Sequence, residues 1–127
     1  MLKDNNDSFK VEYMYDHSAD IFGVKVRRDF SYYETIEIDE GIFLDFDESN
    51  APAALEIHDL SKRLNLPKHS LKKIIFFNMN VTVNNKSISI NTLFNVLIHD
   101  NEKIHKLESI TSNNYNIPTI ETQLFTA

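Results

Sequence analysis

Hydrophobic and polar residues alternate along most of the first half of the chain, with the two-residue period of a β-strand. The alternation predicts strands at FKVEYMY (9–15) and FGVKV (22–26), and the polar segment DHSAD between them predicts the turn of a hairpin. Three further strands are predicted at YETIEI (33–38), IFLDFD (42–47) and AALEI (53–57). The first half therefore predicts a curled antiparallel meander.

The same alternation assigns side chains to the two faces of this sheet. In IFLDFD, Ile42, Leu44 and Phe46 are predicted to face the core, whereas Asp45 and Asp47 face solvent. The tripeptide DEG before this strand predicts a tight turn back from YETIEI.

The period changes after the fifth strand. In LSKRLNL, Leu60 and Leu64 lie four residues apart, which predicts a short helix, and IIFFNMNVTV (74–83) reads as strand again. The fold class predicted is α+β, mainly an antiparallel β meander or curled sheet with one or two short helices. At the C-terminus, NIPTIETQLFTA is expected to be either an added edge strand or a segment that docks on another subunit.

The second half resembles the first when the chain is shifted by 52 residues, since 69 − 17 = 52 pairs His17 with His69 and the same shift pairs Ile36 with Ile88. The shift predicts repeat units at 9–67 and 68–118, followed by a C-terminal extension at 119–127, within a single domain of residues 1–127. Chance similarity between two β segments is the alternative, because few identities support the alignment.

One segment, DFDESNAPAALE, has the spacing of a calcium-binding loop. Asp45, Asp47 and Ser49 occupy loop positions one, three and five, and Glu56 occupies position twelve. The sixth position is Asn50 instead of glycine, and both flanks alternate as strands rather than helices. We therefore interpret these residues as the outer face and turn of a hairpin, and we expect no metal site.

Several separated motifs of the first half resemble a small bacterial and archaeal domain family of unknown function. Its members share a Y-D-x-x-A-D motif, a G-[IV]-x-[VL]-D-[YF]-D strand and an [IL]-E-I-L-x-[AL]-S junction between a strand and a helix. The resemblance covers about residues 11–67 and is carried by Tyr15, Asp16, Ala19, Asp20, Gly41, Asp45, Asp47, Glu56, Ile57 and Ser61.

Two departures from the family pattern stand out. Asn50-Ala51-Pro52 replaces a turn glycine, and Gly23 takes the place of an aromatic residue. The resemblance implies a small β-meander with a helix, sometimes encoded beside a toxin. It implies no catalytic residues.

Composition narrows the functional classes. A chain of 127 residues forms one compact domain by length, and the absence of cysteine excludes disulfides and cysteine-based metal sites. We expect no signal peptide, membrane span or cofactor, and a cytoplasmic location. The formal net charge of −6 repels nucleic acid unless positive charges cluster.

Such a cluster occurs in LSKRLNLPKHSLKKII (60–75). This segment resembles the core of a helix-turn-helix, in which a second helix would begin near HSLKK. Its nucleic-acid contacts would be Lys62, Arg63, Lys68, Lys72 and Lys73. Because strands flank the segment on both sides, we favour a solvated connector between two β halves.

The chain also contains five histidines: His17, His58, His69, His99 and His105. HDNEKIH (99–105) could bring His99, Asp100 and His105 toward a cation, but its sequence favours a hairpin turn. No nucleophile elbow or oxyanion glycine is present, so nucleophilic catalysis has no support.

Adjacent aromatic residues suggest an interaction surface. Neighbours on a strand face opposite sides, so one residue of Tyr32–Tyr33 and one of Phe76–Phe77 should point away from the core. We therefore predict a non-enzymatic protein-interaction module that binds a protein partner or self-associates through its strand edges. The alternative is a DNA-binding regulator or antitoxin that uses residues 60–75; a calcium-dependent module is the third hypothesis.

Overall fold

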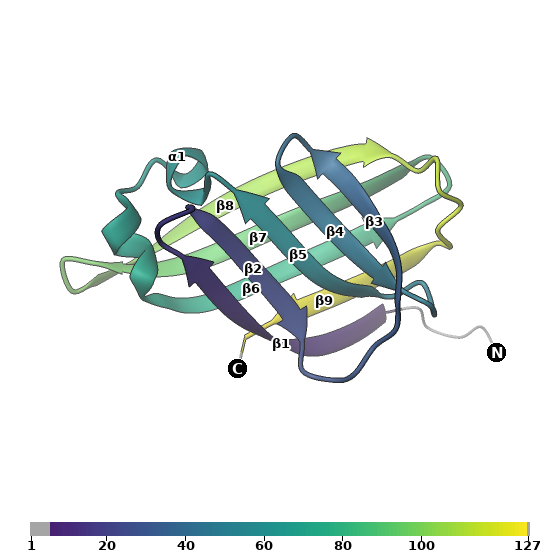
Figure 1. The fold of residues 1–127 in the computed structure, drawn as a ribbon, viewed down its shortest axis with the longest axis horizontal. Coiled ribbons are helices and arrows are strands. Elements are labelled where there is room, and N and C mark those ends of the chain that lie inside the picture. The colour runs from purple at the N-terminus through teal and green to yellow at the C-terminus, as the bar shows by residue number, and fades with distance from the viewer. Residues whose placement is uncertain (1–5, 127) are drawn as a thin grey trace.

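The computed structural model describes residues 6–126 and shows a mainly β protein with one short α-helix and one 3-10 helix (Figure 1). The elements are β1 (Asn6–Asp16), β2 (Ile21–Val26), β3 (Tyr32–Asp39), β4 (Ile42–Asp47), β5 (Pro52–His58), α1 (Leu60–Leu64), η1 (Lys68–Lys72), β6 (Ile74–Val83), β7 (Ser87–Ile98), β8 (Asn101–Ser112) and β9 (Ile120–Phe125). Neither described helix is long and apolar enough to cross a membrane. The predicted mainly β fold with short helices is confirmed.

The described strands form one curled sheet in the order β3-β4-β5-β2-β1-β9-β6-β7-β8. Neighbours are antiparallel except for β1 and β9, which run parallel, so the sheet is mixed. Residues 6–10 of β1 pair with β9, whereas residues 11–16 pair with β2. At this strand the sheet curls into a half-barrel (Figure 1). We call β2–β5 with residues 11–16 the front layer, and β6–β9 with residues 6–10 the back layer.

The core lies between the two layers and is centred on three aromatic rings. Phe22 of β2 packs on Phe77 of β6 and Phe94 of β7, with ring centroids 5.1 and 5.0 Å apart. Phe77 and Phe94 also contact each other at 5.1 Å. All three side chains are fully buried. Such aromatic packing stabilises the fold beyond the burial of area alone, so the layers share one core.

The predicted faces of β4 agree with the structure at four of five positions. Ile42, Leu44 and Phe46 are buried, and Asp45 lies on the outer face. Asp47 was expected in solvent, and this prediction is wrong, since the residue is only 3% exposed. The strand ends at Asp47, and its carboxylate turns back to accept hydrogen bonds from the following turn.

Two hairpin turns depend on backbone conformations with positive φ. Gly41, in the predicted turn between β3 and β4, has φ 79°, and a Cβ there would lie 2.8 Å from Arg63 Nη2. His99 and Asp100 join β7 to β8 with φ values of 50° and 63°. This two-residue connection matches the mirror-image turn that suits twisted hairpins, so the hairpin expected at 99–105 is confirmed.

The adjacent aromatic pairs differ from each other. Phe77 is buried and Phe76 is partly exposed, as predicted for neighbours on a strand. Tyr32 and Tyr33 are both exposed, at 58% and 53%, because the pairing of β3 with β4 shifts register between Tyr32 and Glu34. The shift removes the strict alternation of sides at that end of β3.

The C-terminal segment lies in the middle of the sheet. β9 pairs with β1 on one side and with β6 on the other, so the expectation of an added edge strand is wrong. Leu124 of β9 is fully buried. β9 joins β6 to residues 6–10 of β1, and β1 then continues into the front layer, so the two layers form one sheet.

The structure gives no support to a duplication with a 52-residue shift. That shift places residues 36–46 on residues 88–98. The first range contains the second half of β3, a turn and most of β4, whereas the second lies within the single strand β7. The two ranges share only the inward and outward alternation of a strand, which does not specify where a chain reverses.

Candidate functional site

A buried carboxylate, Asp20, fastens the β1–β2 turn to the start of α1. Asp20 is 3% exposed and has φ 58°. Its Oδ1 accepts hydrogen bonds from the Tyr15 hydroxyl at 2.6 Å and from the Ser61 backbone N–H at 3.0 Å. Its Oδ2 accepts from the Ser61 hydroxyl at 2.6 Å. These contacts join segments that are 41 residues apart in the chain.

The environment of Asp20 favours its ionised form. Burial raises the pKa of Asp20, but the hydrogen bonds from Ser61 and Tyr15 outweigh burial and hold the pKa below its usual value. The Tyr15 hydroxyl has a strongly raised pKa, because burial and the Asp20 carboxylate both oppose its ionisation. Asp20 is therefore a charged hydrogen-bond acceptor, and the neutral phenol of Tyr15 is one of its donors.

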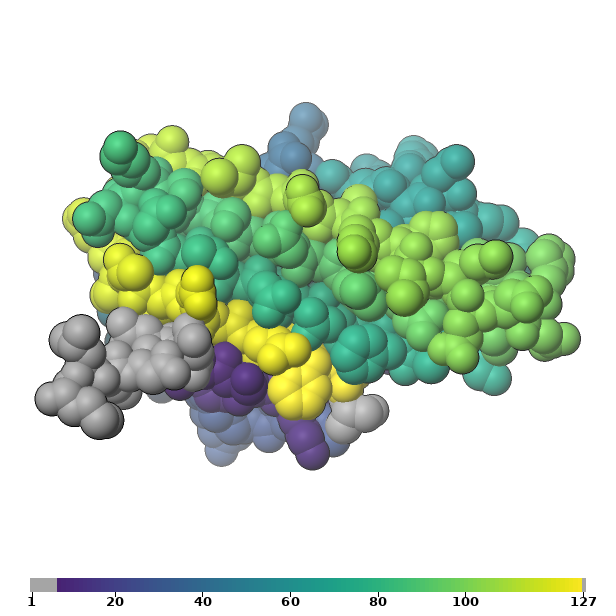
Figure 2. Space-filling view, turned by 180° about the vertical axis from the view of Figure 1, so that it is seen from behind, coloured from purple at the N-terminus to yellow at the C-terminus, as the bar shows by residue number. Residues whose placement is uncertain are grey.

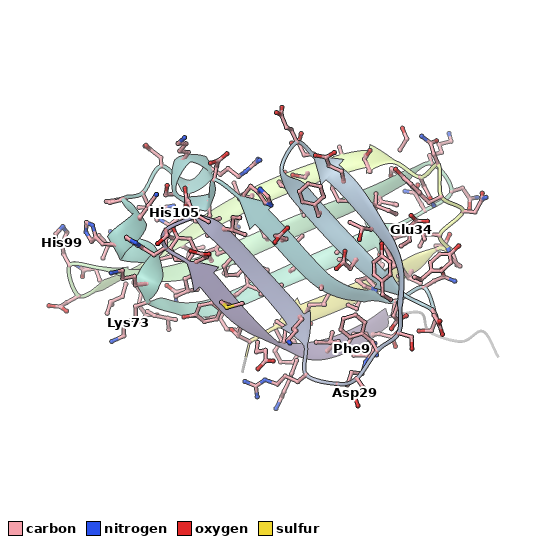
Figure 3. The ribbon with its side chains drawn as sticks, in the orientation of Figure 1. Phe9, Asp29, Glu34, Lys73, His99 and His105 are labelled. Atoms are coloured by element: carbon pink, nitrogen blue, oxygen red, sulfur yellow. The ribbon has the colours of Figure 1, made fainter. Side chains whose placement is uncertain are left out.

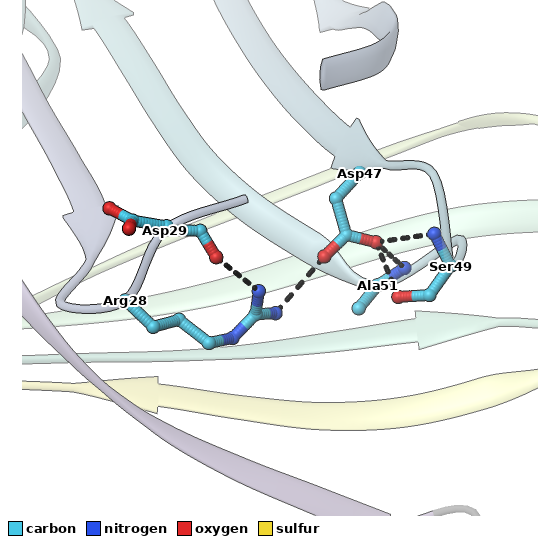
Figure 4. Close-up of polar contacts among 5 residues, drawn as sticks. All are labelled: Arg28, Asp29, Asp47, Ser49 and Ala51. Carbon is cyan, nitrogen blue, oxygen red and sulfur yellow. Dashed lines mark hydrogen bonds and ion pairs between the residues drawn. The ribbon is translucent and has the colours of Figure 1, made fainter. Parts of the chain in front are cut away.

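Asp47 is a second anchor, and it holds the β4–β5 turn (Figure 4). Its Oδ1 accepts from the backbone N–H of Ser49 and of Ala51 at 2.9 and 3.0 Å, and from the Ser49 hydroxyl at 2.6 Å. Arg28 donates to Oδ2 at 3.0 Å. Burial raises the pKa of Asp47, but the hydrogen bonds from Ser49, Ala51 and Arg28 bring it below its usual value.

The four residues of the calcium-loop pattern lie in two separate places. Asp47 and Ser49 bond to each other within the turn. Asp45 lies on the outer face of the front layer, where it accepts from the Thr35 hydroxyl at 2.6 Å. Glu56 lies on β5 beside His58 at 3.1 Å. Within residues 6–126, no three acidic or histidine side chains lie close enough together to hold a metal ion.

The histidines are spread over both layers. His17 lies in the β1–β2 turn, His58 at the end of β5, and His69 in η1. His99 lies at the tip of the β7–β8 turn, and His105 lies on β8, which contacts α1 (Figure 3). The Nε2 atom of His105 is buried and has no hydrogen-bond partner among the described residues.

The basic segment forms a connector between the layers. The second helix of the helix-turn-helix pattern is the five-residue 3-10 helix η1, and β6 follows it directly. Arg63 does not face outward for a phosphate, because Nε donates to the His58 carbonyl at 2.7 Å and Nη2 donates to the Glu40 carbonyl. The four remaining cations are exposed: Lys62, Lys68, Lys72 and Lys73.

An open groove of about 820 Å³ runs across the outer face of the front layer. Gly23 lies in its floor, and an added Cβ would meet only the Leu55 carbonyl oxygen at 3.8 Å. Met14 and Phe43 provide apolar walls beside the carboxylate of Glu12. Asp45 and Glu56 also line this groove, but each is already paired, with Thr35 and His58.

The outer edge of the back layer is formed by β8, which pairs only with β7 among the described strands. Figure 2 shows β6, β7, β8 and β9 side by side on this face, with β8 along its margin. A strand with one neighbour leaves about half of its backbone N–H and C=O groups unpaired by the sheet. β8 is 12 residues long, so this edge is extended.

Outward side chains along β8 combine apolar and charged groups. Ile104 and Ile110 are 60% and 66% exposed, and they are among the most exposed large apolar side chains of the described residues. Lys106 and Glu108 lie between them on the same face and are also exposed. We call the free edge of β8, with the outward residues Glu102, Ile104, Lys106, Glu108 and Ile110, the β8 surface.

Comparison with known families gives a match over residues 12–61 to a protein family of unknown function, DUF2283. The chain is also 31% identical, over 118 residues, to a protein of Methanosarcina mazei provisionally named hypoxanthine phosphoribosyltransferase. The aligned region covers 92% of this chain and 93% of the relative. This chain belongs to the DUF2283 family. No solved structure matched it.

The family motifs coincide with the anchors of the front layer. In this DUF2283 protein, Tyr15 and Ser61 both donate to Asp20, and Asp16 accepts from the Ala19 backbone N–H at 3.1 Å. Asp47 holds the next turn. These motif residues thus stabilise the fold, and the resemblance seen in the sequence is confirmed.

The sequence alone did not single out the β8 surface. The segment NEKIHKLESI has charged residues on both faces, so its alternation is weaker than that of the core strands. Two exposed isoleucines at an interval of six residues, an even number, were the available signal, because even spacing places them on one face of a strand.

Proposed function

We propose that this DUF2283 protein is a non-enzymatic interaction module that binds a protein partner through the β8 surface. The observation that carries the proposal is a 12-residue edge strand with two isoleucines more than half exposed. Edge strands bind extended segments by adding a strand to the sheet, and alternate side chains then provide specificity. Exposed apolar residues on such an edge are a liability unless a partner covers them.

We rank this role above the phosphoribosyl transfer suggested by the name of the Methanosarcina mazei protein. Phosphate groups are commonly bound where a glycine-rich loop enters a helix. Within the described chain, Gly23 lies in β2, Gly41 lies in the β3–β4 turn, and α1 has five residues. The β8 surface, in contrast, has an unpaired strand edge and exposed isoleucines, which a protein partner would cover.

The test is affinity capture with the tagged full-length chain in three forms. Ile104→Lys combined with Ile110→Lys removes the apolar side chains of the β8 surface without touching the buried core. Met14→Lys is the matched control, because Met14 is 75% exposed on the front layer. Thermal unfolding checks that each variant is folded.

We expect wild type and Met14→Lys to retain the same proteins, including untagged copies of the chain, and the double variant to lose them. The proposal is wrong if the folded double variant retains every protein that wild type retains. It is also wrong if the Met14 variant loses the same partners, because the front layer would then be the binding face.

A further inference from the structure

We infer that the partner of the β8 surface is a second copy of this chain, which pairs β8 with β8 in antiparallel orientation about a two-fold axis at Leu107. This inference rests on the proposed interaction role of β8. In a two-fold dimer the same surface meets itself. A residue a given number of positions before Leu107 therefore lies opposite the residue the same number of positions after Leu107 in the second copy. The order of residues along β8 can therefore be tested for self-complementarity.

The outward face of β8 is self-complementary in this register. Lys106 lies opposite Glu108 of the second copy, and the symmetry produces this opposite-charge pair twice. Ile104 lies opposite Ile110 of the second copy, also twice, so the most exposed isoleucines of β8 cover each other. Opposite charges and apolar side chains that face each other across strands are the pairs that stabilise a sheet.

Neighbouring registers lack this complementarity. A two-fold axis at Lys106 places that lysine against itself, and an axis at Glu108 places two glutamates together. Like charges directly opposite each other destabilise strand pairing. Among these three neighbouring registers, the charges on β8 thus favour the one centred on Leu107, whereas charges of a single sign would only have blocked association.

The inward face of β8 also places no like charges opposite each other in this register. His105 lies opposite Ser109 of the second copy in the register centred on Leu107. Lys103 lies opposite Thr111 of the second copy and Leu107 lies opposite Leu107, so no pair on this face joins two like charges. β3 and α1 lie against β8 from the front layer, so the second copy would approach along the edge of the back layer.

The test is light scattering after size exclusion on the full-length chain over a range of concentrations. Wild type should have the mass of a dimer. Lys106→Glu creates two Glu–Glu contacts, and Glu108→Lys creates two Lys–Lys contacts, so each variant should dimerise at least about tenfold more weakly. Lys103→Glu is the matched control, since it makes the same charge change on β8 at a position that lies opposite Thr111.

Mixing the two weakened variants gives the decisive measurement. A Lys106→Glu chain and a Glu108→Lys chain present only opposite charges to each other, so their equimolar mixture should dimerise more tightly than either variant alone. If the mixture remains monomeric, or if Lys106→Glu dimerises as tightly as Lys103→Glu, the inferred register is overturned.

The mass of wild type separates this inference from the proposed function. A monomeric wild type that still loses a captured protein on Ile104→Lys with Ile110→Lys would overturn self-pairing and leave β8 as a binding edge for another protein. A dimer that survives that double variant would overturn self-pairing through β8, and the proposed function would fall with it only if every other captured protein were retained as well.

Discussion

At the scale of single residues, two aspartates hold the loops of the front layer. Asp20 and Asp47 each accept hydrogen bonds from backbone N–H groups and from a serine hydroxyl. In the sequence both look like solvated turn residues, because an acid at the end of a strand or turn, beside polar residues, carries no sign of burial. The partners of Asp20 include Ser61, which only the tertiary fold brings close.

Replacing the charge of Asp20 tests its role as an anchor. Asp20→Asn should lower the free energy of unfolding by about 1–3 kcal/mol near neutral pH, because charge-assisted hydrogen bonds are lost at a buried site. Asparagine tolerates the positive φ of this position, so the backbone is not strained. Asp59→Asn is the control, since Asp59 has φ 57° but is exposed.

The effect of Asp20→Asn should depend on pH. The pKa of Asp20 is lowered in the folded state, below the value of about 3.9 expected for the unfolded chain. The carboxylate therefore stabilises the fold above that pH, and this contribution is lost as the pH falls through the folded-state pKa. Urea unfolding of wild type and of Asp20→Asn at several pH values measures how the difference between their free energies of unfolding depends on pH. A difference that does not shrink in acid would contradict the assignment.

At the scale of elements, the two-residue period located the strands of the first half and their inward side chains. It gave no information about which strands become neighbours. β9 shows the consequence, since a short C-terminal segment with loose alternation pairs on both sides in the centre of the sheet. Backbone pairing between distant segments depends on the closed core and leaves no local signature.

Two substitutions in β9 test its central place. Leu124→Ala should lower the free energy of unfolding by about 2–5 kcal/mol, because Leu124 is fully buried beside Phe9 and Met79. Gln123→Ala, next to it on the exposed face, should cost less than about 1 kcal/mol. Denaturant unfolding of both variants measures the difference. Similar small costs would indicate a peripheral strand.

At the scale of the whole molecule, the two layers depend on each other. The contacts of Phe22 with Phe77 and Phe94 join a front-layer strand to two back-layer strands. The family match over residues 12–61 covers the front layer and the first residues of α1. The match therefore describes part of a core that the rest of the chain completes.

A fragment experiment tests this dependence. The fragment of residues 1–67 should show no cooperative thermal transition, because its inward face would expose Phe22 and the buried side chains of β4 to water. The full chain should unfold in one transition. Circular dichroism during heating measures the unfolding transition of the fragment and of the full chain. A sigmoidal transition in the fragment would mean that the front layer folds alone.

The sequence by itself determined the strand character of the first half, the inward set that includes Ile42, Leu44 and Phe46, and the family. These follow from local periodicity and from motifs that are contiguous in the chain. Tertiary structure decided that Asp47 is buried, that β9 is central and that β8 is left as a free edge. Each of these depends on contacts between distant segments, and the free energy of such contacts is a property of the assembled core rather than of any short stretch of residues.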